Sequence, residues 1–105
     1  METPNLEYIK QLAGDDVAFE QKFIDILKDE FPVERQEYNK TLREGKTNET
    51  ALIVHKLKHK LNILGLENAY RLAVTYEEEL KMENTALKKE FSGILDTIES
   101  YLKTL

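Results

Sequence analysis

The chain has 105 residues, of which 41% are hydrophobic and 33% charged, and its formal net charge is −5. This length suits one domain with a single core, and the composition is too apolar for a disordered chain and too charged for a membrane protein. The acidic balance argues against nucleic-acid binding. The absence of cysteine excludes disulfides and a thiol nucleophile, and the absence of a glycine-rich phosphate loop excludes a kinase.

The N-terminal sequence METPNLEYIKQ has neither a basic start nor an apolar stretch, so no signal peptide is expected. No run of the chain approaches the ~20 apolar residues of a membrane span. We therefore expect a cytoplasmic, monomeric protein without membrane contact. Met1 and the self-contained set of predicted helices favour a stand-alone domain.

Helical periodicity dominates the sequence, and no segment alternates in the manner of a strand. Thr3, Asp16, Thr47 and Asn84 have side chains that favour helix N-caps. Glycine is a common helix stop, and Gly65 directly follows the third predicted helix. The predicted helices cover approximately residues 4–13, 16–44, 48–64, 66–83 and 85–103.

Pro32 lies inside the second of these helices and could end it. The apolar residues before and after the proline are spaced four and seven residues apart, so they lie on one face of a single continuous helix. A second helix that began after a loop would not be expected to keep this spacing. We therefore predict one long, kinked helix of roughly 40 Å, whose overhang the short first helix could cover. The predicted fold is all-α: a single-domain antiparallel four-helix bundle over residues 1–105 with an additional short N-terminal helix. The residues that keep the phase are Phe23, Leu27, Phe31, Tyr38 and Leu42.

Both histidines of the chain fall in the third predicted helix, in the run HKLKHKL that begins at His55. On a helical wheel at ~100° per residue, His55, His59 and Asn62 lie opposite the core face. We therefore expect both histidines to be accessible to solvent. The predicted core face comprises Ile53, Leu57, Leu61 and Leu64.

Three chemistries can be weighed for the two histidines. His55 and His59 have the spacing of a metal-binding pair, but the glutamate of the H-E-x-x-H motif is missing and the adjacent lysines would repel a cation. No nucleophile, base and acid set for acyl transfer is visible. A neutral imidazole can attack phosphorus as a nucleophile, and the lysines would then offset the charge of the phosphoryl group. A surface histidine without a function is the alternative.

The segment from His55 to Gly65, HKLKHKLNILG, resembles the acceptor motif of histidine-containing phosphotransfer (HPt) domains, roughly H-x-[LI]-K-G-x-x-x-x-x-G. The following segment is also similar, with spaced leucines and alanines that lead into an acidic stretch. The N-terminal part resembles the family in its short helix, Gly-Asp turn and long helix with aromatics and a proline. The resemblance covers nearly the whole chain.

The resemblance implies a phosphohistidine carrier in a two-component phosphorelay, not an enzyme. His55 matches the phosphorylated histidine of the family, and Lys58 matches a lysine that helps to neutralise the phosphoryl oxygens. Glu77 occupies a position that often holds a glutamine bonded to the imidazole, although it is also one charge in a run of three glutamates. The implied partners are receiver domains of response regulators and a hybrid sensor histidine kinase. No cofactor is implied on this chain, since Mg²⁺ would belong to the receiver.

One residue departs from the family pattern, because His59 stands where the family has a glycine that leaves the acceptor open. Its imidazole could cover His55, contact the phosphoryl group or lean aside, and could make transfer dependent on pH. Two alternatives therefore stay open: a bundle that binds a receiver without efficient transfer, and a structural or metal-binding bundle that uses both histidines. The expected docking face comprises Ala51, Leu52, Lys56, Lys58, His59, Asn62 and Leu66.

Overall fold

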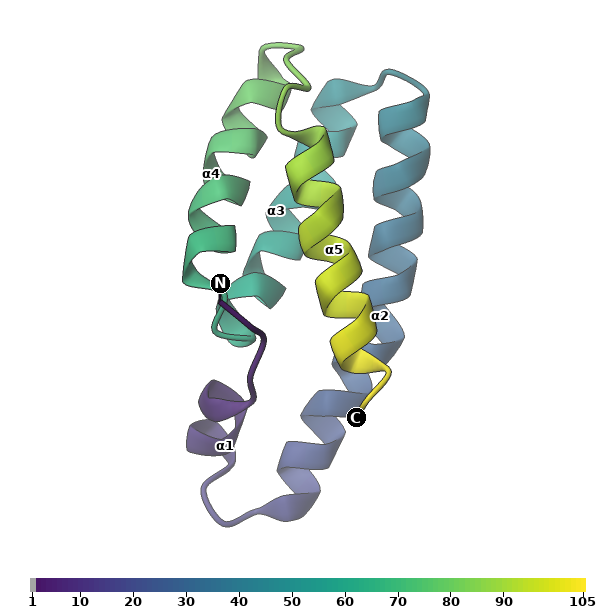
Figure 1. The fold of residues 1–105 in the computed structure, drawn as a ribbon. Coiled ribbons are helices and arrows are strands. Elements are labelled where there is room, and N and C mark those ends of the chain that lie inside the picture. Colours follow the sequence, from purple (N-terminus) through teal and green to yellow (C-terminus); the bar gives the residue numbers. More distant parts are fainter. Residues whose placement is uncertain (1) are drawn as a thin grey trace.

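The computed structural model describes residues 2–105, which form five α-helices and no β-strand. Four helices lie side by side, and the short α1 lies at one end of the molecule (Figure 1). Helix α3 packs against α2 and α4, and α5 contacts α4 and α2, which closes the bundle. This confirms the predicted all-α bundle with an added N-terminal helix, and none of the five helices is long and apolar enough to cross a membrane. The helices are α1 (Glu7–Ala13), α2 (Val17–Arg43), α3 (Thr47–Ile63), α4 (Glu67–Lys81) and α5 (Lys88–Leu102).

Helix α2 runs through Pro32 without interruption, as the continuous apolar phase predicted. Pro32 is exposed, so the carbonyl of Lys28 that loses its helical donor lies on the side of the helix that water can reach. The side chain of Asp16 accepts a hydrogen bond from the Phe19 amide at 3.0 Å, which confirms the predicted N-cap. The first half of α2 extends beyond the other bundle helices, and α1 packs against it (Figure 1).

Two predicted helix starts differ from the structure by three residues, and the N-cap predicted for the third helix was wrong. Helix α1 begins at Glu7, whose amide donates to the Asn5 side chain, and not near residue 4. Helix α3 begins at residue 47, and its N-cap residue Lys46 makes no side-chain cap. The Asn84 side chain accepts from the Ala86 amide in a turn, so α5 begins only at residue 88. Short polar side chains bond readily to nearby amides in turns, which makes a turn and a cap hard to distinguish by sequence.

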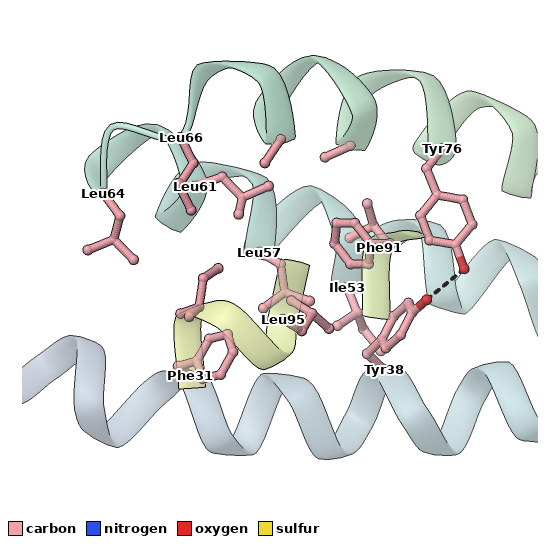
Figure 2. Close-up of a cluster of buried hydrophobic side chains, with 14 of the residues drawn as sticks. Phe31, Tyr38, Ile53, Leu57, Leu61, Leu64, Leu66, Tyr76, Phe91 and Leu95 are labelled. Carbon is pink, nitrogen blue, oxygen red and sulfur yellow. Dashed lines mark hydrogen bonds between the residues drawn. The ribbon is translucent and has the colours of Figure 1, made fainter. Parts of the chain in front are cut away.

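The core is a continuous cluster that joins all five helices, and Figure 2 shows its central part. The hydroxyl groups of Tyr38 on α2 and Tyr76 on α4 lie 2.7 Å apart and share a hydrogen bond. The Phe91 ring of α5 packs against both phenol rings, with centroid distances of 5.4 and 5.2 Å. These aromatic contacts hold α2, α4 and α5 together at the level of the middle of the bundle.

The turn between α3 and α4 is fixed by Gly65 and by the N-terminal segment. Gly65 has a φ of 75°, and a Cβ atom there would lie 2.6 Å from Nδ2 of Asn5. The Asn5 amide also donates to the Leu64 carbonyl at 2.9 Å. The Glu2 carboxylate accepts from the Asn68 and Ala69 amides at the start of α4, at 3.0 and 2.8 Å. This turn sets the register in which α3 and α4 lie side by side.

Candidate functional site

His55 lies near the middle of α3, and 53% of its side chain is exposed. The opposite face of α3 is buried in the core, so the predicted division of this helix into an inner and an outer face is confirmed. His59 and Asn62 are exposed, as predicted. The buried residues of the inner face are Ile53, Leu57, Leu61 and Leu64.

The predicted docking face includes two residues that the structure buries. Ala51 is packed in the core, because α4 covers this side of α3, and Leu66 turns inward directly after Gly65. A helical wheel shows where a residue lies on its own helix but not where a neighbouring helix covers it. Neither residue is therefore available to a partner. Leu52 and Lys56 are exposed and remain on the outer face of α3.

Glu77 of α4 lies beside His55, where the family resemblance placed an imidazole partner. Its Oε1 atom is 3.1 Å from Nδ1 of His55, and only 11% of its side chain is exposed. A carboxylate can only accept, so Nδ1 carries the proton in this hydrogen bond. The second ring nitrogen, Nε2, is then unprotonated in the neutral imidazole and has its lone pair free.

Glu77 is held as a carboxylate by the cations around it. Burial by itself would raise the pKa of Glu77, but hydrogen bonds from Lys58 and His55 outweigh this and lower the pKa below its ordinary value. The Lys58 ammonium is 3.1 Å from the same oxygen, Oε1. The Lys81 ammonium approaches the other oxygen, Oε2, at 3.7 Å. The face of His55 that meets α4 therefore meets a fixed negative charge.

Lys58 is mostly buried and is turned toward α4. Only 12% of its side chain is exposed, and its ammonium lies 5.9 Å from the centroid of the Tyr70 ring as well as against Glu77. A lysine expected to meet phosphoryl oxygens thus contacts the carboxylate that holds His55. To reach an anion at Nε2 its side chain would have to leave that carboxylate.

His59, the residue in place of the usual glycine, packs against the His55 ring. The two ring centroids are 5.1 Å apart, and the rings are nearly perpendicular at 88°. The His59 side chain makes no hydrogen bond or ion pair within residues 2–105, and its contact with His55 is one of ring packing. Its ring covers one side of His55 but leaves about half of that side chain exposed.

Two surface hollows meet at His55. One, of about 560 Å³, lies between α2 and α3, and the other, of about 520 Å³, lies between α3 and α4. His55 and the exposed Leu52 line both, so the outer face of α3 forms a ridge between them. The α3/α4 hollow is lined by Asn48, Ala51, Leu52, His55, Glu77 and Lys81.

Two lysines that the fold places in specific contacts were not predicted from the sequence. Lys60 is buried against α2, where its ammonium lies 3.0 Å from both Glu30 and Glu34. The spacing of these two glutamates, one turn apart on α2, was the signal available in the sequence. Lys81 follows Glu77 by one turn on α4 and lies on the α3/α4 hollow.

The site has the chemistry of an oriented, solvent-accessible imidazole. Within residues 2–105 no group of three or more potential metal-ligating side chains comes together. Comparison of the chain with models of protein families, with curated proteins and with solved structures gives no match.

Proposed function

We propose that this chain is a phosphohistidine carrier of the HPt type. In this proposal His55 accepts a phosphoryl group from an aspartyl phosphate on one receiver domain and passes it to an aspartate of another. The observation that supports it most is the hydrogen bond from Nδ1 of the exposed His55 to the buried Glu77 carboxylate. That bond leaves the lone pair of Nε2 free on a ring that is about half exposed, so an incoming phosphorus atom can approach it.

The transfer step is a nucleophilic substitution at phosphorus. The Nε2 lone pair of His55 forms a bond to phosphorus, and the bond from phosphorus to the aspartyl oxygen breaks. The receiver's carboxylate leaves with that electron pair, and the imidazole keeps its Nδ1 proton and becomes positively charged. Glu77 faces that charge at 3.1 Å and stabilises the phosphorylated ring. The onward transfer reverses these bond changes with a second carboxylate.

The proposed partners are receiver domains, and any Mg²⁺ in the reaction belongs to them. A receiver would meet the ridge of α3 around His55, where Leu52 offers an exposed apolar contact and Lys56 a charged one. Contacts of this kind between signalling proteins tend to be small and transient. A hybrid sensor histidine kinase that carries a receiver domain would be one source of the phosphoryl group.

A second candidate function is a bundle that binds a receiver but transfers poorly. The observation that favours it is the edge-on contact of the His59 ring with the His55 ring. A metal-binding bundle is less well supported, because Nδ1 of His55 is already bonded to Glu77 and the ammonium groups of Lys58 and Lys81 adjoin that carboxylate. The two proposals differ in whether the wild-type protein gains a phosphoryl group.

The test is covalent labelling with phosphoramidate, followed by intact mass measurement. We expect an acid-labile gain of one phosphoryl group in the wild type and in His59→Gln, the matched control, and none in His55→Gln. A gain that is lost only in His59→Gln would show that the acceptor was assigned to the wrong histidine. No gain from phosphoramidate or from a phosphorylated receiver, with receiver binding intact in His55→Gln, would support the second candidate.

A further inference from the structure

The α3/α4 hollow beside His55 carries a cation that neither the sequence motif nor the proposed function assigns. Lys81, at the last position of α4, lines this hollow together with His55 and Glu77. Its side chain is 52% exposed, compared with 12% for Lys58. An anion that enters the hollow toward His55 would therefore meet the ammonium group of Lys81 at a position where both charges stay in contact with solvent.

The contacts of Lys81 leave its ammonium available to a ligand. It lies 3.7 Å from Oε2 of Glu77 and 3.3 Å from Oε1 of Glu78. Glu78 is mostly exposed, and exposed ion pairs of this kind contribute little to stability. Release of Lys81 from Glu78 toward an anion thus costs little, whereas Lys58 would have to leave a mostly buried hydrogen bond.

The balance of charge around the histidine also points to Lys81. Lys58 and Glu77 form a pair with no net charge, so they do not by themselves attract a phosphoryl group. The hollow on the other side of His55 is lined by three lysines and three glutamates, which offset one another. The α3/α4 hollow is lined by one lysine, Lys81, and one glutamate, Glu77, and Lys58 already neutralises that glutamate from outside the hollow. Lys81 is therefore the cation of this hollow that can offset the charge of an incoming dianion.

We propose that Lys81 binds the oxygens of a phosphoryl group that reaches His55 through the α3/α4 hollow. This inference deepens the proposed function and rests on it for its biological meaning, but the anion site itself can be tested without any covalent transfer. Lys81 is then a binding residue of the reaction, and Lys58 acts mainly through Glu77, as a positioning residue.

The test is a titration with inorganic phosphate that follows the imidazole NMR signals of the two histidines. Ionic strength is held constant, because exposed charges are screened by salt. We expect phosphate to shift the His55 signals and Lys81→Gln to weaken its affinity about fivefold, the scale of one exposed charge pair. Lys81→Arg should keep most of the affinity. Lys89→Gln, which removes an exposed lysine of α5, is the matched control and should change it less than twofold.

In the titration, three results would overturn the inference. They are the absence of any phosphate-dependent shift at His55, an unchanged affinity in Lys81→Gln, and a loss that appears in Lys58→Gln but not in Lys81→Gln. Thermal unfolding of each variant checks that the fold is intact. Phosphate binding that depends on Lys81, with no covalent gain from phosphoramidate, would uphold the anion site and refute the carrier function. Covalent gain at an unchanged rate in Lys81→Gln would uphold the carrier function and refute the role of Lys81.

Discussion

The charge of Glu77, and not only its hydrogen bond, is expected to accelerate phosphorylation of His55. Glu77→Gln keeps an oxygen that can accept from Nδ1 but removes the negative charge that faces it at 3.1 Å. During transfer the imidazole becomes positively charged, so the carboxylate stabilises the transition state more than it stabilises the neutral starting ring.

The size of the effect follows from the type of bond that is lost. Hydrogen bonds to a charged group contribute about 1.5–3 kcal/mol and neutral ones about 0.5–1.5 kcal/mol. The replacement of the charged acceptor by a neutral one in Glu77→Gln therefore loses about 1 kcal/mol of stabilisation. Glu77 is mostly buried, so solvent screens this difference only weakly, but the Lys58 ammonium on the same oxygen keeps the loss at the lower end of the range that these values allow. Since about 1.4 kcal/mol corresponds to a tenfold change in rate, we expect Glu77→Gln to be phosphorylated about fivefold more slowly. Glu77→Ala removes the acceptor as well and should be slower still.

The assay is the initial rate of mass gain with excess phosphoramidate near neutral pH. Glu90→Gln is the matched control, because it removes an exposed carboxylate of α5 that contacts neither His55 nor Lys81, and should change the rate less than twofold. Equal rates in wild type and Glu77→Gln would refute the argument from charge. A rate in Glu77→Ala that equals or exceeds that in Glu77→Gln would refute the orienting role of the hydrogen bond.

Three further predictions concern stability and are measured as free energies of unfolding in denaturant. The pKa of Glu77 is lowered in the folded state, so its ionised carboxylate stabilises the fold above its ordinary pKa of 4.5, and this stabilisation is lost as the pH falls through the folded-state pKa. The free energy of unfolding should therefore fall less on acidification in Glu77→Gln than in the wild type. Gly65→Ala should cost about 1–3 kcal/mol, since it places a Cβ at positive φ and 2.6 Å from Asn5, whereas alanine at Gly93, which has open space and lies inside α5, should not destabilise. Lys60→Ala should cost about 1–3 kcal/mol, because it leaves the mostly buried Glu34 without its cation. Phosphorylation of His55 should continue in this variant, and an unchanged free energy of unfolding would show that the ion pair does not stabilise the fold.

The parts of the fold that could be predicted from sequence are those that a single helix determines by itself. The continuous apolar phase across Pro32 and the core face of α3 depend only on helical periodicity, and both are confirmed. Asp16 caps α2 because an aspartate directly before an amphipathic stretch has few competing contacts. Gly65 ends α3 because the left-handed backbone there favours glycine.

The parts that could not be predicted depend on what a neighbouring helix does. The burial of Ala51 follows from the close packing of α4 on that side of α3, which no wheel of α3 alone contains. Lys60 is buried because two glutamates of α2 face it, so its environment is a property of the pair of helices. Asn84 is a different case with a local cause: it was expected to cap a helix, but its side chain accepts from the Ala86 amide in a turn.

The juxtaposition of His55 and Glu77 lies between these two cases. The residues are 22 positions apart on different helices, and helical periodicity alone does not bring them together. What brings them together is the tight turn at Gly65, because helices that reverse direction there place residues at similar distances from the turn side by side. One inserted residue in that turn would rotate α4 by about 100° relative to its present register and carry the carboxylate away from the imidazole. The contacts of Asn5 and Glu2 with this turn, which are remote from His55, therefore support the orientation of the ring as well as the stability of the bundle.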